Sequence, residues 1–192
     1  VFSNTSKDSV EDRAKYTPAV LELLGSQDPM TVLRDTPTAL GRATAGLTPA
    51  QLRTPEAPGK WSILEILGHL VDEERLDFRA RIESTLAHPE ADWLPIEPDR
   101  WVLEQNFNAR EVSVLLTAFL EERQRSLVWL SSLHDADWGR CHWHPTLDSD
   151  FTAASLLCAW AAHDVLHVRQ ISGVLFAHLA LAARLLRRYD IA

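Results

Sequence analysis

The sequence predicts an all-α protein built as a four-helix bundle. Its composition is that of a helical globular protein, with 46% hydrophobic residues, 24% charged residues and only seven glycines among 192 residues. Long segments carry apolar residues at helical spacing, and no stretch shows the alternation of a strand. Capping signals and proline-rich loops divide these segments into four long helices, with a long connection in the middle.

The length suits a single domain with one terminal addition. We expect residues 1–27 to form a polar arm and a short helix, over 16–25, that pack on the bundle. Residues 28–192 then make up the bundle itself.

The first long helix is predicted to begin after Asp28 and to run to about residue 45. Asp28 is a good N-cap, and Pro29 suits the first helical position. Pro37 lies inside this span and predicts a kink or a restart of the helix. Thr48 and Pro49 open a single further turn.

The second long helix is predicted over residues 62–87. Ser62 is followed three residues later by Glu65, the spacing of a capping box. Residues 72–75 on this helix are charged, and we expect a mostly solvated face there. Residues 89–107 contain three prolines and are expected to be a crossover connection with little regular structure.

The third and fourth helices complete the bundle. Asn108 and Glu111 have capping-box spacing and predict a helix over 109–133. Residues 134–149 are expected to form a loop, and the last helix to run from about residue 150 to about 188, with Gly173 as a point of interruption.

Charge and cysteine content narrow the function classes. A net charge of −8 disfavours nucleic-acid binding, which requires clustered basic residues. The two cysteines, Cys141 and Cys158, are too few for a disulfide framework and indicate a reducing, cytoplasmic environment. No apolar leader and no segment long enough to span a membrane is visible in the sequence, so we expect no membrane partner.

Three histidines form the candidate site. His163 and His167 are four residues apart, so they share one face of the last helix. His69 lies on the apolar stripe of the second helix and is expected to point inward as well. If the two helices are neighbours, three neutral imidazoles could hold a Zn, Ni or Fe ion and leave one coordination position open.

An ordinary structural role is the alternative for these histidines. A histidine on an apolar helix face is more often a core residue with a hydrogen-bond partner than a metal ligand. The case for a metal is stronger when all three are taken together, because each buried imidazole would otherwise need its own partner.

Two segments resemble the DinB/YfiT-like superfamily, in particular its DinB-like helical-bundle branch. They are G-K-W-S-I-L-E-I-L-G-H-L at residues 59–70 and A-A-H-D-V-L-H-V-R-Q-I at residues 161–171. The resemblance implies an up-down-down-up bundle, often a homodimer, with a divalent metal held by His69, His163 and His167. It also implies a small-molecule substrate and, as in the members with an assigned activity, which are often thiol-dependent transferases or isomerases, a low-molecular-weight thiol as co-substrate.

Several other side chains are candidates near this site. Glu73, four residues after His69, is the preferred acid, either as a general base or as a support for a metal ligand. Arg169 and Gln170 are expected at a dimer interface or on an anionic substrate. His142 and His144 are placed in a loop at the surface or at a pocket rim.

Two classes of function therefore remain open at the level of sequence. The first is a metal-dependent enzyme, either a thiol S-transferase or a hydrolase. The second is a non-catalytic bundle that binds a small ligand or a partner and uses a metal only to join its helices. A nucleic-acid-binding role is a weaker third idea, which the acidic balance opposes.

Overall fold

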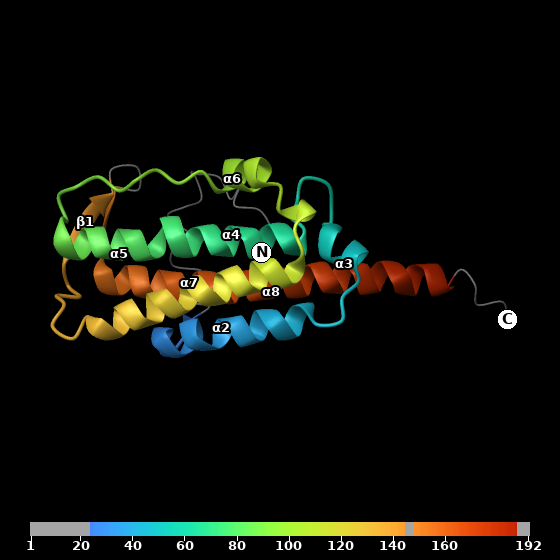
Figure 1. Cartoon of the computed structure of the whole chain (residues 1–192), viewed down its shortest axis with the longest axis horizontal. Helices are drawn as coiled ribbons and strands as arrows, with labels where there is room; N and C mark the ends of the chain where they lie inside the picture. The colour runs from blue at the N-terminus through green and yellow to red at the C-terminus, as the bar shows by residue number, and fades with distance from the viewer. Residues whose placement is uncertain (1–23, 145–147, 188–192) are drawn as a thin grey trace.

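Four helical columns lie side by side and form the bundle (Figure 1). The computed structural model describes residues 24–144 and 148–187, with side chains up to residue 181. The columns are α2 (Pro29–Thr44), α4 (Ile63–Leu76) continued by α5 (Phe78–Ala87), α7 (Val112–Ser132) and α8 (Ala153–Arg187). The chain runs along α2, returns along α4 and α5, crosses over to run the same way along α7, and comes back along α8 (Figure 1). The predicted up-down-down-up bundle is confirmed.

The first helix begins as predicted but is not interrupted. The Asp28 carboxylate accepts a hydrogen bond from the amide of Thr31 at 2.9 Å, and Pro29 starts α2. Helix α2 continues through Pro37 to Thr44, so the expected restart is wrong. The short helix expected over 16–25 lies outside the described residues, except for its last two positions. The turn predicted at Thr48 is the short helix α3 (Pro49–Arg53).

The capping box of Ser62 and Glu65 is present, and it fixes where α4 begins. The single helix expected over 62–87 is instead two helices, separated at Asp77, whose φ and ψ are −117° and −95°. Backbone hydrogen bonds from Asp77 to Glu73 and from Arg81 to Asp77 keep the two helices end to end. The apolar period therefore passes through the break, which is why the sequence pattern does not reveal it.

The connection between α5 and α7 is more regular than expected. It contains α6 (Pro98–Gln105) and a short 3₁₀ turn, η2 (Phe107–Ala109). The predicted capping role of Asn108 is wrong, because α7 begins at Val112 with Glu111 as its N-cap. The Asn108 Oδ1 atom instead accepts a hydrogen bond from Ser62 Oγ at 2.8 Å, which attaches the connection to the start of α4.

A small hairpin replaces part of the loop expected over 134–149. Strands β1 (Cys141–His144) and β2 (Ser149–Thr152) pair antiparallel, with Cys141 opposite Thr152. Each strand has four residues, which is too short for a clear alternation of apolar and polar side chains. Helix α8 follows directly and passes Gly173 without a break, as one 35-residue helix.

The core divides into two apolar clusters along the bundle. One is centred on α4 and contains η2, and the other joins α2, α5 and the first half of α8. Members of the cluster centred on α4 include Leu40, Ile63, Ile66, Leu67, Leu70, Phe107, Phe119 and Ile171.

No helix in the described parts of the chain is both long enough and apolar enough to cross a membrane.

Candidate metal centre

The structure brings the three histidines together between α4 and α8. His69 comes from α4, while His163 and His167 come from consecutive turns of α8. The Nε2 atom of His163 lies 3.3 Å from Nε2 of His69 and 3.0 Å from Nε2 of His167. His69 and His167 are buried, and His163 is half-buried. Three ring nitrogens therefore face one point inside the bundle.

The other nitrogen of two of these rings faces a side chain on its own helix. Nδ1 of His167 lies 2.6 Å from Oε1 of Gln170, which accepts its hydrogen bond. Nδ1 of His69 lies 3.6 Å from Oε1 of Glu73, and among the described residues neither atom has a hydrogen-bond partner. The Gln170 oxygen therefore holds a proton on Nδ1 of His167 and leaves the Nε2 lone pair of that ring free for a metal.

Burial keeps the three imidazoles neutral. It lowers the pKa of His69 and of His163 well below the ordinary value, and the neighbouring histidines add to this effect. Burial also lowers the pKa of His167 to about 4, although Gln170 and Asp164 act in the opposite direction. Neutral imidazole is the form that binds a metal ion.

The donor set fits a divalent transition metal. When two ligand nitrogens sit tetrahedrally at about 2.0–2.1 Å from a zinc ion, they are separated by about 3.3 Å. The two short Nε2 separations, 3.3 Å and 3.0 Å, are close to this value. Without a cation, three neutral rings cannot all be satisfied by one another, because an Nε2 proton on His163 could serve only one of its two neighbours.

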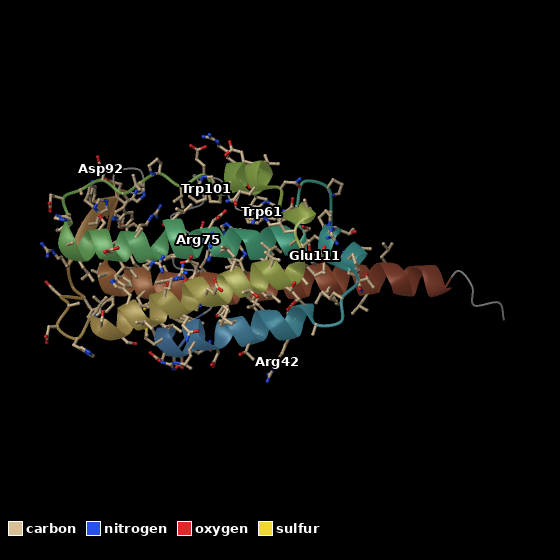
Figure 2. The ribbon with its side chains drawn as sticks, in the orientation of Figure 1. Arg42, Trp61, Arg75, Asp92, Trp101 and Glu111 are labelled. Atoms are coloured by element: carbon tan, nitrogen blue, oxygen red, sulfur yellow. The ribbon has the colours of Figure 1, made fainter. Side chains whose placement is uncertain are left out.

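Aromatic side chains contact two of the three rings. The ring of Trp61, which precedes α4, lies 4.8 Å from that of His69, and Figure 2 shows Trp61 at the end of the bundle where α4 begins. Phe78 lies 5.2 Å from His163 and stacks on Trp160 at 5.8 Å between centroids. Trp160 is itself a core residue, whose indole N–H donates to Glu74 at 2.9 Å.

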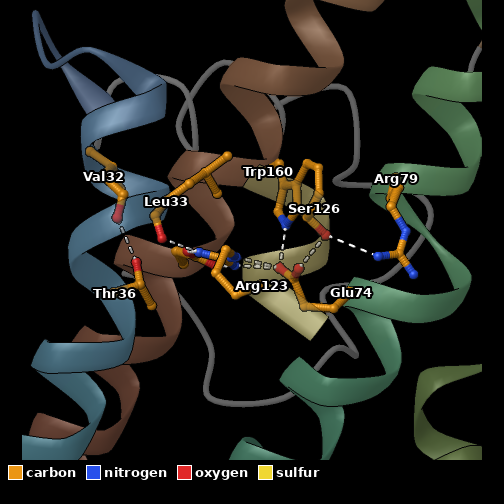
Figure 3. Close-up of polar contacts among 9 residues, drawn as sticks. Val32, Leu33, Thr36, Glu74, Arg79, Arg123, Ser126 and Trp160 are labelled. Atoms are coloured by element: carbon orange, nitrogen blue, oxygen red, sulfur yellow. Dashed lines mark hydrogen bonds and ion pairs between the residues drawn. The ribbon is translucent and has the colours of Figure 1, made fainter. Parts of the chain in front are cut away.

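Next to the histidines lies a buried ionic network. Figure 3 shows the Arg123 guanidinium of α7 at the Glu74 carboxylate of α4, and Arg123 also pairs with Asp164 of α8. All three side chains are about 1% exposed. Ser126 donates a hydrogen bond to Glu74 at 2.9 Å. The solvated face expected over 72–75 is therefore wrong for residues 72–74, which are buried.

Some candidate residues lie elsewhere. His142 is on β1, where its Nδ1 is 2.9 Å from the carbonyl oxygen of Pro89 and its ring stacks on Trp93. His144 is on the same hairpin, which lies at one end of the bundle in Figure 1. The structure does not bring this pair to the three histidines.

Gln170 is the residue near the site that sequence reasoning assigned wrongly. We expected it at an interface or on a substrate, but it is buried and bound to His167. Its spacing of three residues after His167 was the available signal, because residues at i and i+3 are neighbours on a helix.

Comparison with known proteins identifies the family. Residues 33–171 match the DinB superfamily, which covers most of the bundle and all three histidines. The chain is 24% identical over 141 residues to "Putative metal-dependent hydrolase YfiT" of Bacillus subtilis, covering 73% of this chain and 79% of that protein. It is 27% identical over 143 residues to "Putative metal-dependent hydrolase BcerKBAB4_2443" of Bacillus mycoides, covering 72% of this chain and 80% of that protein.

A solved structure supports the fold. That of YfiT from Bacillus subtilis, described as a four-helix bundle of unusual topology, matches with a TM-score of 0.69 at 21% identity. The match covers 90% of this chain and 91% of that one. On the strength of the sequence match over residues 33–171 and of this shared bundle, the chain belongs to the DinB superfamily.

Proposed function

We propose that this protein is a metal-dependent enzyme of the DinB type. His69, His163 and His167 would hold one divalent ion, Zn, Ni or Fe, through their Nε2 atoms. The observation that carries the proposal is the convergence of these ligand atoms, all within 4.8 Å of one another. Three protein ligands leave a coordination position open, which is typical of catalytic rather than structural sites.

The surrounding residues prepare this site for chemistry. Gln170, and Glu73 at a longer distance, face the Nδ1 atoms, so the Nε2 lone pairs point at the ion. The rings of Trp61 and Phe78 shield the histidines on two sides. A divalent ion bound here lowers the pKa of a water or thiol that it coordinates, which supplies a nucleophile at neutral pH.

Substitution of one ligand tests the metal site. We expect about one transition metal per chain in the purified protein and less than a tenth of that in His163→Ala, because two ligands bind far more weakly than three. Elemental analysis measures this directly. His178→Ala is the matched control, since it removes another half-buried histidine of α8, one that contacts the Thr54 carbonyl, and it should retain the metal. Full activity in a metal-free preparation would contradict the proposal.

The nucleophile activated by the metal is either water or a low-molecular-weight thiol, and turnover assays distinguish the two. The names of the relatives favour water and hence hydrolysis. The sequence resemblance favours a low-molecular-weight thiol and hence S-transfer to an electrophile. We expect a panel of esters and amides, assayed without thiol, to show hydrolysis in the first case. Electrophiles assayed with bacillithiol, mycothiol or glutathione would show thiol-dependent turnover in the second.

The non-catalytic alternative makes a different prediction. If the ion only joins α4 to α8, chelation should lower the melting temperature while no substrate in either panel turns over. If the ion is catalytic, chelation should abolish turnover, and adding back the metal should restore it. Measuring both quantities on one sample distinguishes the two roles.

We also propose that the protein acts on a small molecule as a cytoplasmic homodimer. The mass of one chain is 21.6 kDa, so light scattering should give about twice this value. A monomeric mass would contradict the dimer without affecting the metal site, because all three histidines come from one chain.

A further inference from the structure

A row of charged side chains leads away from His69 along α4 and α5. Glu73, Asp77 and Arg81 follow it at intervals of four residues, one helical turn each. Glu73 and Asp77 are each 3% exposed, and the Arg81 side chain is 19% exposed. Burial of ionisable groups is costly unless they are paired, so this row requires an explanation.

Each member of the row contacts the next. Oε1 of Glu73 lies 3.6 Å from Nδ1 of His69, and burial together with the nearby Asp77 carboxyl raises the pKa of Glu73 well above its ordinary value. Asp77 in turn forms a short ion pair with Nε of Arg81. The row therefore runs from the candidate ligand His69 through Glu73 and Asp77 to Arg81, across the junction of α4 and α5.

The outer end of the row is also fixed. The Arg81 guanidinium lies over the ring of Trp93, 4.8 Å from its centroid. The ring of His142 stacks on Trp93 at 4.2 Å, and its Nδ1 atom is in contact with the Pro89 carbonyl. The crossover connection and the hairpin therefore hold Arg81 in place.

We propose that Asp77 and Arg81 are positioning residues for the metal ligand His69. Arg81 holds Asp77, Asp77 holds Glu73, and Glu73 presents Oε1 as the acceptor for the Nδ1–H of His69. The His69 ring is then oriented with Nε2 toward the ion. This inference rests on the proposed metal site. It adds that the crossover connection, through Arg81, helps to set the orientation of the metal ligand His69.

The geometry at His69 supports a positioning role over a purely structural one. Among the residues that the structure describes, Nδ1 of His69 and Oε1 of Glu73 have no hydrogen-bond partner, although both atoms are buried. They face each other at 3.6 Å, slightly beyond hydrogen-bond distance. A small rotation of either side chain would bring the two atoms within hydrogen-bond distance of each other.

Binding of Co²⁺ to the metal-free protein tests the proposal. We expect Arg81→Gln to weaken Co²⁺ binding about tenfold, the lower end of the range for residues that support metal ligands. The visible absorption spectrum of the Co²⁺ protein should change as well, because the orientation of one ligand changes. Arg81→Lys keeps the positive charge and should restore most of the affinity.

Arg79→Gln is the matched control. Arg79 is two residues away on the same helix, its side chain is 23% exposed, and it pairs with Glu122 of α7 instead. We expect its Co²⁺ affinity to stay within about twofold of the wild type. Thermal unfolding of both metal-free variants measures the stability that each has lost. If the two losses are similar, a difference in Co²⁺ affinity is not a folding effect.

The possible outcomes are distinct. If Arg81→Gln and Arg79→Gln bind Co²⁺ equally well, the positioning role is wrong and the row only stabilises the junction of α4 and α5. If the wild type itself binds no Co²⁺, the proposed function fails, and with it the basis of this inference. Weakened binding in Arg81→Gln alone, with rescue by Arg81→Lys, supports it.

Discussion

At the scale of single residues, burial decides the charge of the three histidines, and it makes stability depend on pH. The pKa of His167 is about 4 in the folded, metal-free protein, whereas an unfolded histidine titrates near 6.5. A lowered pKa means that the unfolded chain binds more protons between these values. The stability contributed by neutral His167 is therefore complete above pH 6.5 and is lost as the pH falls toward 4.

This pH dependence can be measured by urea unfolding in the presence of a chelator. Between pH 7.5 and pH 5, His167 should cost the wild type about 2 kcal/mol of unfolding free energy. Burial raises the pKa of Glu73 and of Glu74, which contributes with the opposite sign. The comparison with His167→Gln isolates the histidine, and an equal pH dependence in both proteins would contradict the prediction.

At this scale, sequence reasoning predicted the three candidate ligands and one acid beside them, Glu73, but not the buried partners of other polar side chains. The histidines are visible because spacing and apolar neighbours place them on inward helix faces. The buried ion pair of Glu74 was not predicted, since a polar residue on a helix looks the same in sequence whether it faces water or a buried partner. Only the arrangement of α4, α7 and α8 shows that Glu74 meets Arg123.

At the scale of elements, Gly68 determines how closely η2 packs on α4. A Cβ atom at this position would lie 2.2 Å from Cγ of the Phe107 ring, so the ring lies directly on the helix backbone. Phe107 is 2% exposed and belongs to the core, which leaves it little room to move. We expect Gly68→Ala to lower the unfolding free energy by about 1–3 kcal/mol through overpacking.

Gly41 is the matched control in α2. It is also inside a helix, but a Cβ there would meet nothing within 4 Å. Gly41→Ala should raise the unfolding free energy by about 0.5–1 kcal/mol, because alanine is the better helix former. Chemical denaturation measures both variants, and the prediction fails if Gly68→Ala is as stable as the wild type.

Elements with long apolar periods were predictable, and those set by single residues were not. Capping signals placed the starts of α2 and α4 correctly, because the cap is local chemistry of a few residues. The hairpin, in contrast, packs on residues distant in sequence, such as Trp93, whose ring stacks on that of His142. Local pattern contains no information on such contacts.

At the scale of the whole molecule, Arg123 of α7 contacts residues in each of the other three helical columns. From α7 it pairs with Glu74 of α4 and Asp164 of α8, and its Nη1 donates to the carbonyl of Leu33 in α2 at 2.7 Å (Figure 3). Arg123→Met would leave two buried carboxylates without a counter-ion. We expect it to lower the unfolding free energy by about 3–5 kcal/mol.

Arg125→Met provides the control for this substitution. Arg125 is on the same helix and pairs with Glu122, but its side chain is 64% exposed, so its loss should cost less than about 1 kcal/mol. Denaturant unfolding compares the two variants, and similar costs would mean that the buried network contributes no more than a surface ion pair.

Pro37 explains why Leu33 has a carbonyl available for Arg123. A proline has no amide hydrogen, so it cannot donate to the carbonyl four residues before it, which is that of Leu33. In wild type the Arg123 guanidinium occupies this acceptor, whereas in Arg123→Met the buried carbonyl loses its partner. Pro37→Ala supplies a backbone donor, so it should stabilise the Arg123→Met protein by about 1 kcal/mol more than it stabilises the wild type. A double-mutant cycle of unfolding free energies measures this difference, and strict additivity would show that the proline and the arginine act independently.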